Sequence, residues 1–260
     1  MAIYQQSGTP VPRAVRIAFQ PIVDLESCTV HAHEALARGP AGEGADWVFA
    51  GLDGPQLGDI DHRLRVRAMQ VAMTLGLRGL LSVNLFPDSE GCPSVAIQRT
   101  LAAAEALGFP RHQLIFEITE STRVMRPARL RDFIALYRDV GFRTALDDFG
   151  DGHCGLLLLS EFRPNVIKLA HEFTRRAPHD GRARTVIRHL LSTARDLGCE
   201  VIAESVERKE ESEVLRDLGI PLQQGYWFAR PGIEHLPAVQ WAQPPVRHAC
   251  CEASRWAVSL

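Results

Sequence analysis

The sequence predicts an α/β fold in which parallel strands alternate with helices, a modified TIM-type (β/α)8 barrel. Three observations support this fold class. Eight short apolar runs follow one another along the chain, amphipathic segments separate most of them, and polar residues stand at the ends of nearly all of them. The chain has 260 residues, which is enough for one barrel-sized domain.

The eight predicted strands are short runs rich in Val, Ile, Leu and Phe. They occupy residues 16–25, 29–37, 80–86, 113–120, 143–150, 165–170, 200–207 and 222–228. Only Glu26, Ser27 and Cys28 separate the first two runs, and this connection is too short for a parallel crossover. We therefore expect an antiparallel first strand, which departs from a regular TIM barrel.

Amphipathic helices are expected in the segments that lie between the strands. Their apolar residues recur at three- and four-residue intervals in the ranges 61–77, 94–107, 128–140, 181–197 and 209–218. A glycine follows four of these segments, as expected of a left-handed C-terminal cap. These glycines are Gly108, Gly141, Gly198 and Gly219.

The chain is expected to form one domain, residues 16–237, between an N-terminal extension, 1–15, and a C-terminal tail, 238–260. No run approaches the roughly 18 apolar residues of a membrane span, and the N-terminus lacks a secretory apolar core. We therefore expect a cytoplasmic protein without a membrane partner. The net charge of −2 gives no support to a DNA or RNA polymer as the partner.

Acidic and amide residues lie at or just beyond the end of nearly every predicted strand. In an α/β barrel these ends converge on one face. The residues expected to meet there are Glu34, Asn84, Glu117, Glu120, Asp147, Asp148, Lys168, Glu204 and Gln224. Packed carboxylates cannot all stay ionised without a cation, and oxygen donors favour a hard ion such as Mg²⁺, Mn²⁺ or Ca²⁺.

The adjacent Asp147 and Asp148 favour a site for two metal ions. Two ions about 3.5–4 Å apart can clamp an in-line phosphoryl displacement. Lys168 would orient or deprotonate the attacking water, or neutralise charge on the phosphate. The sequence therefore predicts metal-dependent cleavage of a phosphodiester.

Two other interpretations fit parts of this pattern. A single glutamate at a strand end is usually a solvated loop residue, and an Asp-Asp pair more often caps a helix or turn. The joint placement of so many polar residues at one end of the strands argues against that reading. A glycosidase would use Glu117 and Glu204 as an acid/base pair, but this leaves Asn84, the Asp147-Asp148 pair and Lys168 without a role.

Short motifs occur in a fixed order at residues 18–22, 34–38, 82–85, 117–121, 147–150, 167–168, 203–207 and 224–226, followed by Pro231. This series resembles EAL domains, the bacterial cyclic di-GMP phosphodiesterases, whose name is spelled by Glu34-Ala35-Leu36. The resemblance covers roughly residues 16–232. It implies a TIM-type barrel with an antiparallel first strand and hydrolysis of cyclic di-GMP to linear pGpG with Mg²⁺ or Mn²⁺. By analogy with the family, a homodimer is expected.

The resemblance also implies roles for single residues. By matching positions, the ligands of the first metal are Glu34, Asn84, Glu117 and Asp147, and those of the second are Asp147, Asp148 and Glu204. Lys168 resembles the lysine that contacts the attacking water, and Glu120 the glutamate that anchors the loop after Asp148. Residues similar to substrate contacts are Gln20, Arg38 and Gln224, and Glu207 is similar to a supporting acid.

Three positions depart from the family pattern. Ala170 stands where the family commonly has an aspartate, two residues after Lys168. Residues 150–155 differ from the usual loop, and Ser205 replaces a usual glycine beside Glu204. These departures keep open an alternative function, in which a degenerate EAL domain binds cyclic di-GMP or a protein partner without hydrolysis.

Overall fold

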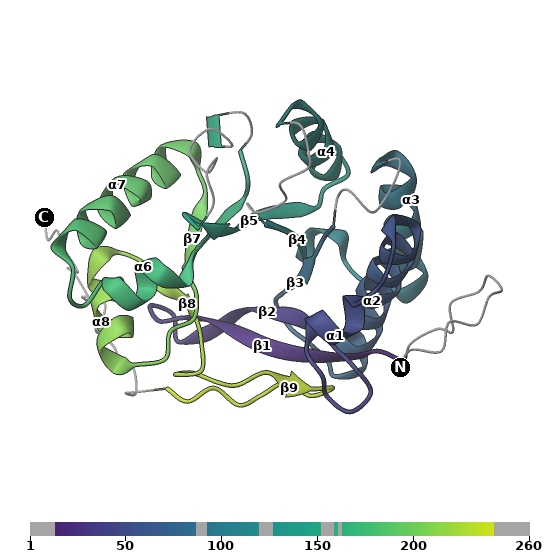
Figure 1. Cartoon of the computed structure of the whole chain (residues 1–260), viewed down its shortest axis with the longest axis horizontal. Helices are drawn as coiled ribbons and strands as arrows, with labels where there is room; N and C mark the ends of the chain where they lie inside the picture. The colour runs from purple at the N-terminus through teal and green to yellow at the C-terminus, as the bar shows by residue number, and fades with distance from the viewer. Residues whose placement is uncertain (1–13, 87–92, 120–126, 152–158, 161–162, 242–260) are drawn as a thin grey trace, which may run out of the picture.

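Eight strands close into a barrel with the helices on its outside (Figure 1). The structure is a computed structural model that describes residues 14–86, 93–119, 127–151, 159–160 and 163–241. The barrel strands are β1 (Arg16–Asp24), β2 (Thr29–Arg38), β3 (Leu80–Asn84), β4 (Leu114–Thr119), β5 (Arg143–Phe149), β6 (Val166–Leu169), β7 (Glu200–Ala203) and β8 (Leu222–Gln224). A short strand, β9 (Gly232–Ile233), pairs with β1 outside the barrel.

The strand order confirms the modified TIM-type barrel. Strands β2 to β8 follow one another in parallel, and β1 closes the ring between β8 and β2. Strand β1 is antiparallel to both of these neighbours, as the short first connection predicts. Strands β7 and β8 each end four residues earlier than expected. Strand β7 stops at Ala203, before a left-handed residue at Ser205, and β8 stops at Gln224, before Gly225.

The helices of the described residues are α1 (Ala45–Phe49), α2 (Gly54–Thr74), α3 (Pro93–Leu107), α4 (Pro127–Asp139), α6 (His171–Arg176), α7 (Gly181–Leu197) and α8 (Lys209–Leu218), with a 3₁₀ turn at η2 (Arg111–Gln113). The five expected helices are present. The short helices α1 and α6 were not expected, and α2 begins earlier than the apolar pattern indicates. Its start is fixed by a capping box at Asp53. The Asp53 carboxylate accepts a hydrogen bond from the backbone N–H of Gln56, and the Gln56 side-chain oxygen accepts one from the backbone N–H of Asp53.

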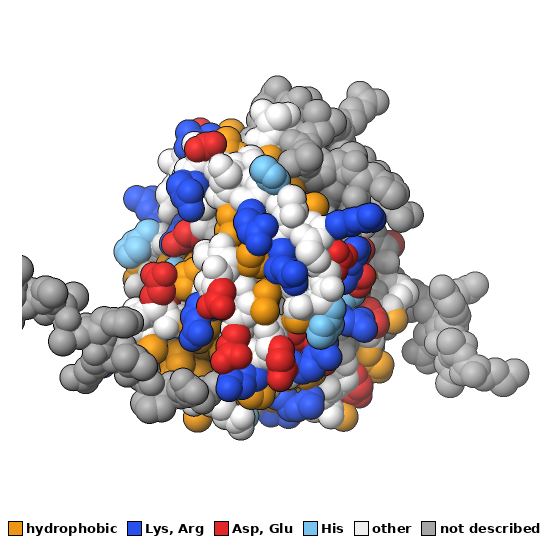
Figure 2. All heavy atoms as spheres, turned by 90° about the vertical axis from the view of Figure 1, so that its left-hand side faces the viewer, with side chains coloured by type: hydrophobic (Ala, Val, Ile, Leu, Met, Phe, Trp, Pro, Cys, Tyr) orange, Lys and Arg blue, Asp and Glu red, His pale blue; other side chains and the backbone are white. Residues whose placement is uncertain are grey.

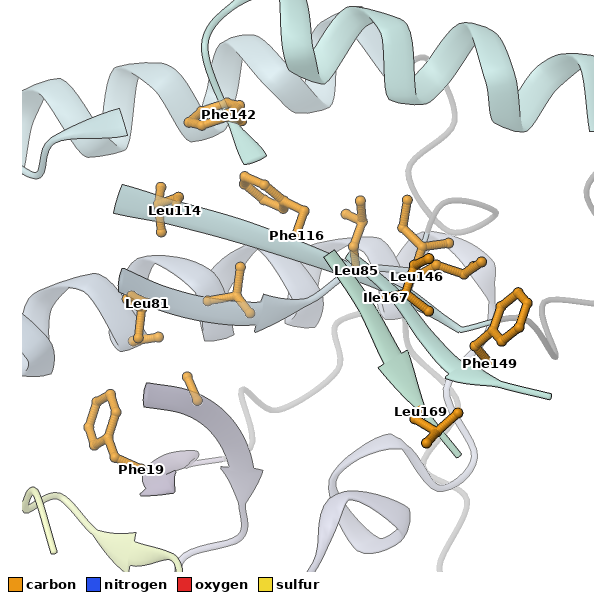
Figure 3. Close-up of a cluster of buried hydrophobic side chains, with 14 of the residues drawn as sticks. Phe19, Leu81, Leu85, Leu114, Phe116, Phe142, Leu146, Phe149, Ile167 and Leu169 are labelled. Carbon is orange, nitrogen blue, oxygen red and sulfur yellow. The ribbon is translucent and has the colours of Figure 1, made fainter. Parts of the chain in front are cut away.

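The outer core lies between the strands and the helices. Aromatic rings fill part of this layer, where Phe116 makes edge-to-face contacts with Tyr137 and Phe142 at centroid distances of 4.7 and 4.9 Å. Figure 3 shows this cluster, with Leu81, Leu114 and other side chains packed beside it. This apolar layer holds the helices against the barrel.

A second, smaller core fills the barrel interior at the end nearer the N-termini of the parallel strands. Its buried members are Ile22, Ala32, Ile115, Ala145, Val166, Ile202 and Leu222. Almost every barrel strand contributes one side chain, and the branched residues form a closed layer, as expected in a TIM-type barrel. This layer is the floor beneath the polar residues described below.

The surface over α6, α7 and α8 carries both signs of charge. Figure 2 shows Lys and Arg side chains interspersed with Asp and Glu side chains on this face. No helix within the described ranges combines the length and the apolar character that crossing a membrane demands.

Candidate active site

Strand alternation brings the candidate site residues into the barrel interior. Residues two positions apart on a strand share a face, so each floor residue of a parallel strand is followed on the same face by a polar residue. These pairs are Ala32 and Glu34, Ile115 and Glu117, Ala145 and Asp147, Val166 and Lys168, Ile202 and Glu204, and Leu222 and Gln224. Since these strands are parallel, the polar members form one layer at their C-terminal ends.

Lys168 lies at the centre of this polar layer and is only 1% exposed. Its Nζ is 2.6 Å from Glu204 Oε1, 2.8 Å from Glu117 Oε1, 3.1 Å from Asp147 Oδ1 and 3.6 Å from Glu34 Oε2. One ammonium group therefore faces four carboxylates from four different strands. A single positive charge cannot neutralise four carboxylates in so small a volume.

Asp147 and Asp148 are adjacent in the sequence, yet both carboxylates lie at the site. In a regular strand, neighbouring side chains point to opposite faces. Asp148 instead has a left-handed φ of 52°, and the register between β5 and β6 shifts between Leu146 and Phe149. This break lets one carboxylate oxygen from each of Asp147, Asp148 and Glu204 lie within 4.8 Å of the others.

Burial and crowding shift the pKa values of these groups. Burial, together with neighbouring carboxylates, raises the pKa of Glu117 to about 8 and that of Glu204 well above its ordinary 4.5. Burial by itself would lower the pKa of Lys168, but the carboxylates around it, Asp147 first, raise it above 10.5. The lysine therefore stays charged, while the protein alone does not keep all of the carboxylates ionised.

Amide side chains on β1, β3 and β8 surround Glu34, which lies on β2. Gln224 Nε2 donates to Glu34 Oε2 at 2.6 Å and to Gln20 Oε1 at 3.3 Å. Gln20 Nε2 in turn donates to the carbonyl of Ala229 at 3.1 Å, and Asn84 Nδ2 lies 3.4 Å from Glu34 Oε1. This network holds the orientation of Glu34 and joins the predicted substrate contacts to the predicted metal ligands.

Ser82 is a member of the site to which the sequence analysis gave no role. It is 1% exposed, and its hydroxyl donates to Glu117 Oε1 at 2.6 Å. The available signal was its spacing, because Ser82 precedes Asn84 by two residues and so shares its inward face.

Arg38 and Glu207 lie outside this polar layer. The guanidinium of Arg38 donates to the carbonyl of Ala37 at 2.8 Å and makes no ion pair within the described part of the chain. Glu207 is exposed and lines the same cavity as Glu34 and Glu204, and its backbone N–H donates to Glu211 Oε2 at 2.9 Å. Glu120 lies outside the described residues. The roles of these residues stay predictions.

Gly225 lets the loops after β7 and β8 approach one another. A Cβ at this position would lie 2.0 Å from the carbonyl oxygen of Val206, so a larger residue cannot fit. The two loops are joined there by backbone bonds from Val206 to Gln224 and from Trp227 to Val206, of 3.0 and 2.9 Å. This contact fixes the ends of the strands that carry Glu204 and Gln224.

Two cavities meet at Glu34. The smaller, of about 230 Å³, is lined by Gln20, Glu204, Ser205, Gln224 and Tyr226 among others. The larger, of about 480 Å³, extends from Asp147 and Asp148 toward α1 and α2.

The larger cavity has walls that the sequence analysis did not identify. Phe49 and Phe86 stand edge to face, with centroids 4.9 Å apart. Asp61 and Arg65 form a buried ion pair of 2.5 Å on one face of α2. Their spacing of four residues was the only signal in the sequence.

The donor set fits a hard divalent cation. Glu117 Oε2 is buried and has no hydrogen-bond partner among the described residues, and the buried Asp147 Oδ1 faces the Lys168 ammonium at 3.1 Å. Buried polar atoms are normally satisfied, so the unpartnered Glu117 Oε2 indicates room for a positive ligand. All the available donors are oxygen atoms, which Mg²⁺, Mn²⁺ and Ca²⁺ prefer. Asp147, Asp148 and Glu204 lie close enough to hold such an ion together, and Glu34, Asn84 and Glu117 belong to the same polar layer.

Comparison with known proteins extends these observations. The family model of the EAL domain matches residues 12–231 of the chain. A relative from Escherichia coli (strain K12), named probable cyclic di-GMP phosphodiesterase PdeN, is 27% identical over 266 residues, which cover 94% of this chain and 49% of the relative. The chain spans about half the length, or less, of the first curated relatives it matches.

Solved structures are similar over most of the chain. One is a standalone versatile EAL protein from Vibrio cholerae O395 in its c-di-GMP bound form, with a TM-score of 0.85 and 35% identity over 89% of this chain and 98% of that chain. Another is the manganese/cy-diGMP complex of Klebsiella pneumoniae BlrP1 at pH 9.0, with a TM-score of 0.81 and 31% identity over 88% of this chain and 59% of that chain. Both similarities therefore cover nearly nine tenths of this chain.

Proposed function

Because this chain belongs to the EAL domain family, we propose that it hydrolyses cyclic di-GMP to linear pGpG in a reaction that requires Mg²⁺ or Mn²⁺. The observation that carries the proposal is the carboxylate cluster around Lys168, in which the buried Glu117 Oε2 lacks a hydrogen-bond partner among the described residues. Support also comes from a relative named as a probable phosphodiesterase and from similar structures with bound cyclic di-GMP.

Two groups of side chains would hold the ions. The first group is Glu34, Asn84, Glu117 and Asp147, and the second is Asp147, Asp148 and Glu204. When bound, a pair of divalent ions supplies positive charge that draws the phosphate oxygens and acidifies the attacking water. The carboxylates contribute by fixing where this charge lies.

Lys168 is proposed to orient the attacking water and to offset charge on the phosphate. Its Nζ is within 3.1 Å of oxygens of Glu117, Asp147 and Glu204, so its position is fixed from several sides. The pKa of Lys168 is raised, and the group is a hydrogen-bond donor at neutral pH. It therefore acts through its positive charge and its N–H groups.

The two cavities at Glu34 are proposed to hold the two halves of the cyclic dinucleotide. On one side, Tyr226 is half exposed and Arg230 stacks on its ring at 4.4 Å, which gives a flat surface for a base. On the other side, Phe49 and Phe86 offer an aromatic wall. A phosphodiester between two such bases would lie over the carboxylates.

The proposal is tested by incubating the purified protein with cyclic di-GMP in Mg²⁺, in Mn²⁺ and in excess EDTA. Chromatography follows pGpG, and calorimetry measures nucleotide binding in parallel. We expect product with metal and none in EDTA. Absence of product in every metal, with the nucleotide bound intact, contradicts the hydrolase.

A second candidate function is a cyclic di-GMP receptor without hydrolysis. The observation that favours it is Ala170, which is fully buried two residues after Lys168, at the start of α6. The substitution Ala170→Asp separates the two functions. The hydrolase predicts a turnover that changes by less than about threefold, because four carboxylates already surround Lys168. The receptor predicts no product before the substitution, and product after it if the missing aspartate is what prevents hydrolysis.

We also propose that residues 16–237 act as the catalytic unit and that two copies associate. Both proposals rest on the family resemblance. Light scattering coupled to size exclusion measures the mass in solution, and a monomer at micromolar concentration contradicts the dimer.

A further inference from the structure

We propose that Ser82 is a positioning residue that fixes the Glu117 carboxylate so that one of its oxygens faces the metal. The inference rests on the proposed metal requirement and assigns to Ser82 a part in meeting it. Ser82 lies on β3 and Glu117 on the neighbouring β4, and both are 1% exposed. The Ser82 hydroxyl donates to Glu117 Oε1 at 2.6 Å.

The two oxygens of Glu117 have different surroundings. Oε1 accepts from Ser82 and lies 2.8 Å from Lys168 Nζ, so two donors hold the same atom. Oε2 is buried and has no hydrogen-bond partner among the residues that the structure describes. The two donors therefore select the rotation of the carboxylate group and leave Oε2 for a cation.

The register of the strands explains why the donor at this place is a serine. Asn84 lies directly opposite Glu117, and Ser82 lies opposite Ile115, one step closer to the barrel floor. The hydroxyl therefore approaches Glu117 from the side of the apolar floor, whereas the site opens at the C-terminal ends of the strands, on the other side of Glu117. A longer side chain at Ser82 would fill the interior, and alanine would offer no donor.

Groups that orient a metal ligand affect metal binding without touching the ion. Removing such a partner commonly costs about 10- to 100-fold in metal affinity. For Ser82→Ala we expect a loss in this range, because Glu117 can then turn about its side-chain bonds. Lys168 contacts the same oxygen but also contacts other carboxylates, so it does not replace the missing bond.

The test measures Mn²⁺ binding by calorimetry without nucleotide, so the readout does not depend on turnover. Three variants accompany the unchanged protein: Ser82→Ala, Ser82→Thr, which keeps the hydroxyl, and Thr144→Val as the control. Thr144 is a buried residue of β5 whose hydroxyl has no hydrogen-bond partner in the described structure. Thr144→Val therefore removes a buried hydroxyl that does not contact the site. Thermal unfolding in EDTA is recorded for each variant.

We expect Ser82→Ala to weaken Mn²⁺ binding by 10- to 100-fold, and Ser82→Thr and Thr144→Val to bind almost as the unchanged protein does. If Ser82→Ala does not fold, Ser82→Cys takes its place, and a weaker donor should give an intermediate loss. Unchanged affinity in a folded Ser82→Ala or Ser82→Cys protein overturns the inference. Equal losses in Ser82→Ala and Ser82→Thr also overturn it. If the unchanged protein itself binds no Mn²⁺, the proposed function fails instead.

Discussion

The two ends of the barrel interior are formed by the same strands, but one end is lined by apolar side chains and the other by charged and amide side chains. At the apolar end, Ile115, Val166 and Ile202 belong to a closed apolar layer. Two residues further along the same strands, Glu117, Lys168 and Glu204 form a buried cluster of charges. A distance of two residues, about 7 Å along a strand, separates the layer that stabilises the fold from the layer proposed to act on a ligand.

This comparison shows that the apolar layer stabilises the folded chain, whereas the layer of carboxylates destabilises it. Buried apolar side chains lower the free energy of the folded chain. Buried carboxylates that face one another raise it, and this cost is recovered only when a cation binds. Substitutions in the two layers should therefore have opposite consequences.

The largest effect is expected for Asp147→Asn in the polar layer. Its carboxylate is proposed to contact both ions, so turnover should fall by at least about a hundredfold. The thermal midpoint in EDTA should not fall, because one of the repelling charges is removed. Product formation and thermal unfolding measure the two parts. The exposed Asp217→Asn on α8 is the matched control, and retained turnover in Asp147→Asn would refute the site assignment.

The reverse outcome is expected for Ile202→Ala in the apolar floor. Ile202 is 1% exposed, and such truncations cost about 2–5 kcal/mol of unfolding free energy. Mn²⁺ affinity and turnover of the folded fraction should remain, since Glu204 and Lys168 are unaltered. Urea unfolding and calorimetry test this. Loss of metal binding in a folded Ile202→Ala protein would show that the two layers are not separable.

A moderate effect is expected on the pH dependence of the unfolding free energy, to which the polar layer contributes through Glu117. Because the pKa of Glu117 is raised to about 8, the native protein without metal keeps a proton that the unfolded chain releases. The unfolding free energy in EDTA should therefore fall as pH rises from 5 to 8. Buried His33 and half-buried His62, with pKa values lowered to about 4, act in the opposite direction below pH 6.5.

The Glu117 contribution is isolated by comparison with Glu117→Gln across the same pH range in EDTA. The difference between the two thermal midpoints should change steadily between pH 5 and 8. Saturating Mn²⁺ should remove the decline, since an ion competes with the proton for the carboxylate. A constant difference would mean that Glu117 does not hold the proton.

The smallest effect is expected at Ser205, on the rim of the polar layer. Its φ of 54° is left-handed, a conformation that costs a residue with a Cβ about 1 kcal/mol. Ser205→Gly should raise the unfolding free energy by about that amount, or the midpoint by roughly 2–4 °C. Ser205→Ala keeps the Cβ and should show no gain. Equal midpoints for both variants would contradict strain at this position.

The sequence was sufficient for the barrel because its information is periodic. Apolar runs, glycine caps and a three-residue first connection determine the strands, the helix ends and the antiparallel pair. The short helices α1 and α6 were missed because five or six residues are too few for a helical pattern. The early start of α2 was missed because it depends on the cap at Asp53 and not on apolar spacing.

The site was predictable as a set of residues but not as a geometry. Position at strand ends indicated that Glu34, Glu117, Asp147 and Glu204 should meet, and the distances to Lys168 place them together. Their roles as ligands remain predictions. The convergence of the carboxylates of Asp147 and Asp148 depends on the left-handed conformation of Asp148. No pattern in the sequence predicts that conformation. The Ser82 bond depends on a register that only the paired strands define.

The reversed direction of β1 has a consequence for how this protein can be handled. Arg16, the first residue of β1, lies opposite Arg38, the last residue of β2, so the chain enters the barrel at the end that carries the carboxylates. A regular barrel would begin at the other end. A fluorophore attached near residue 14 would therefore report from the same side as the bound ligand. An affinity tag placed there shares that side too, and moving it to another part of the surface is the safer choice for binding assays.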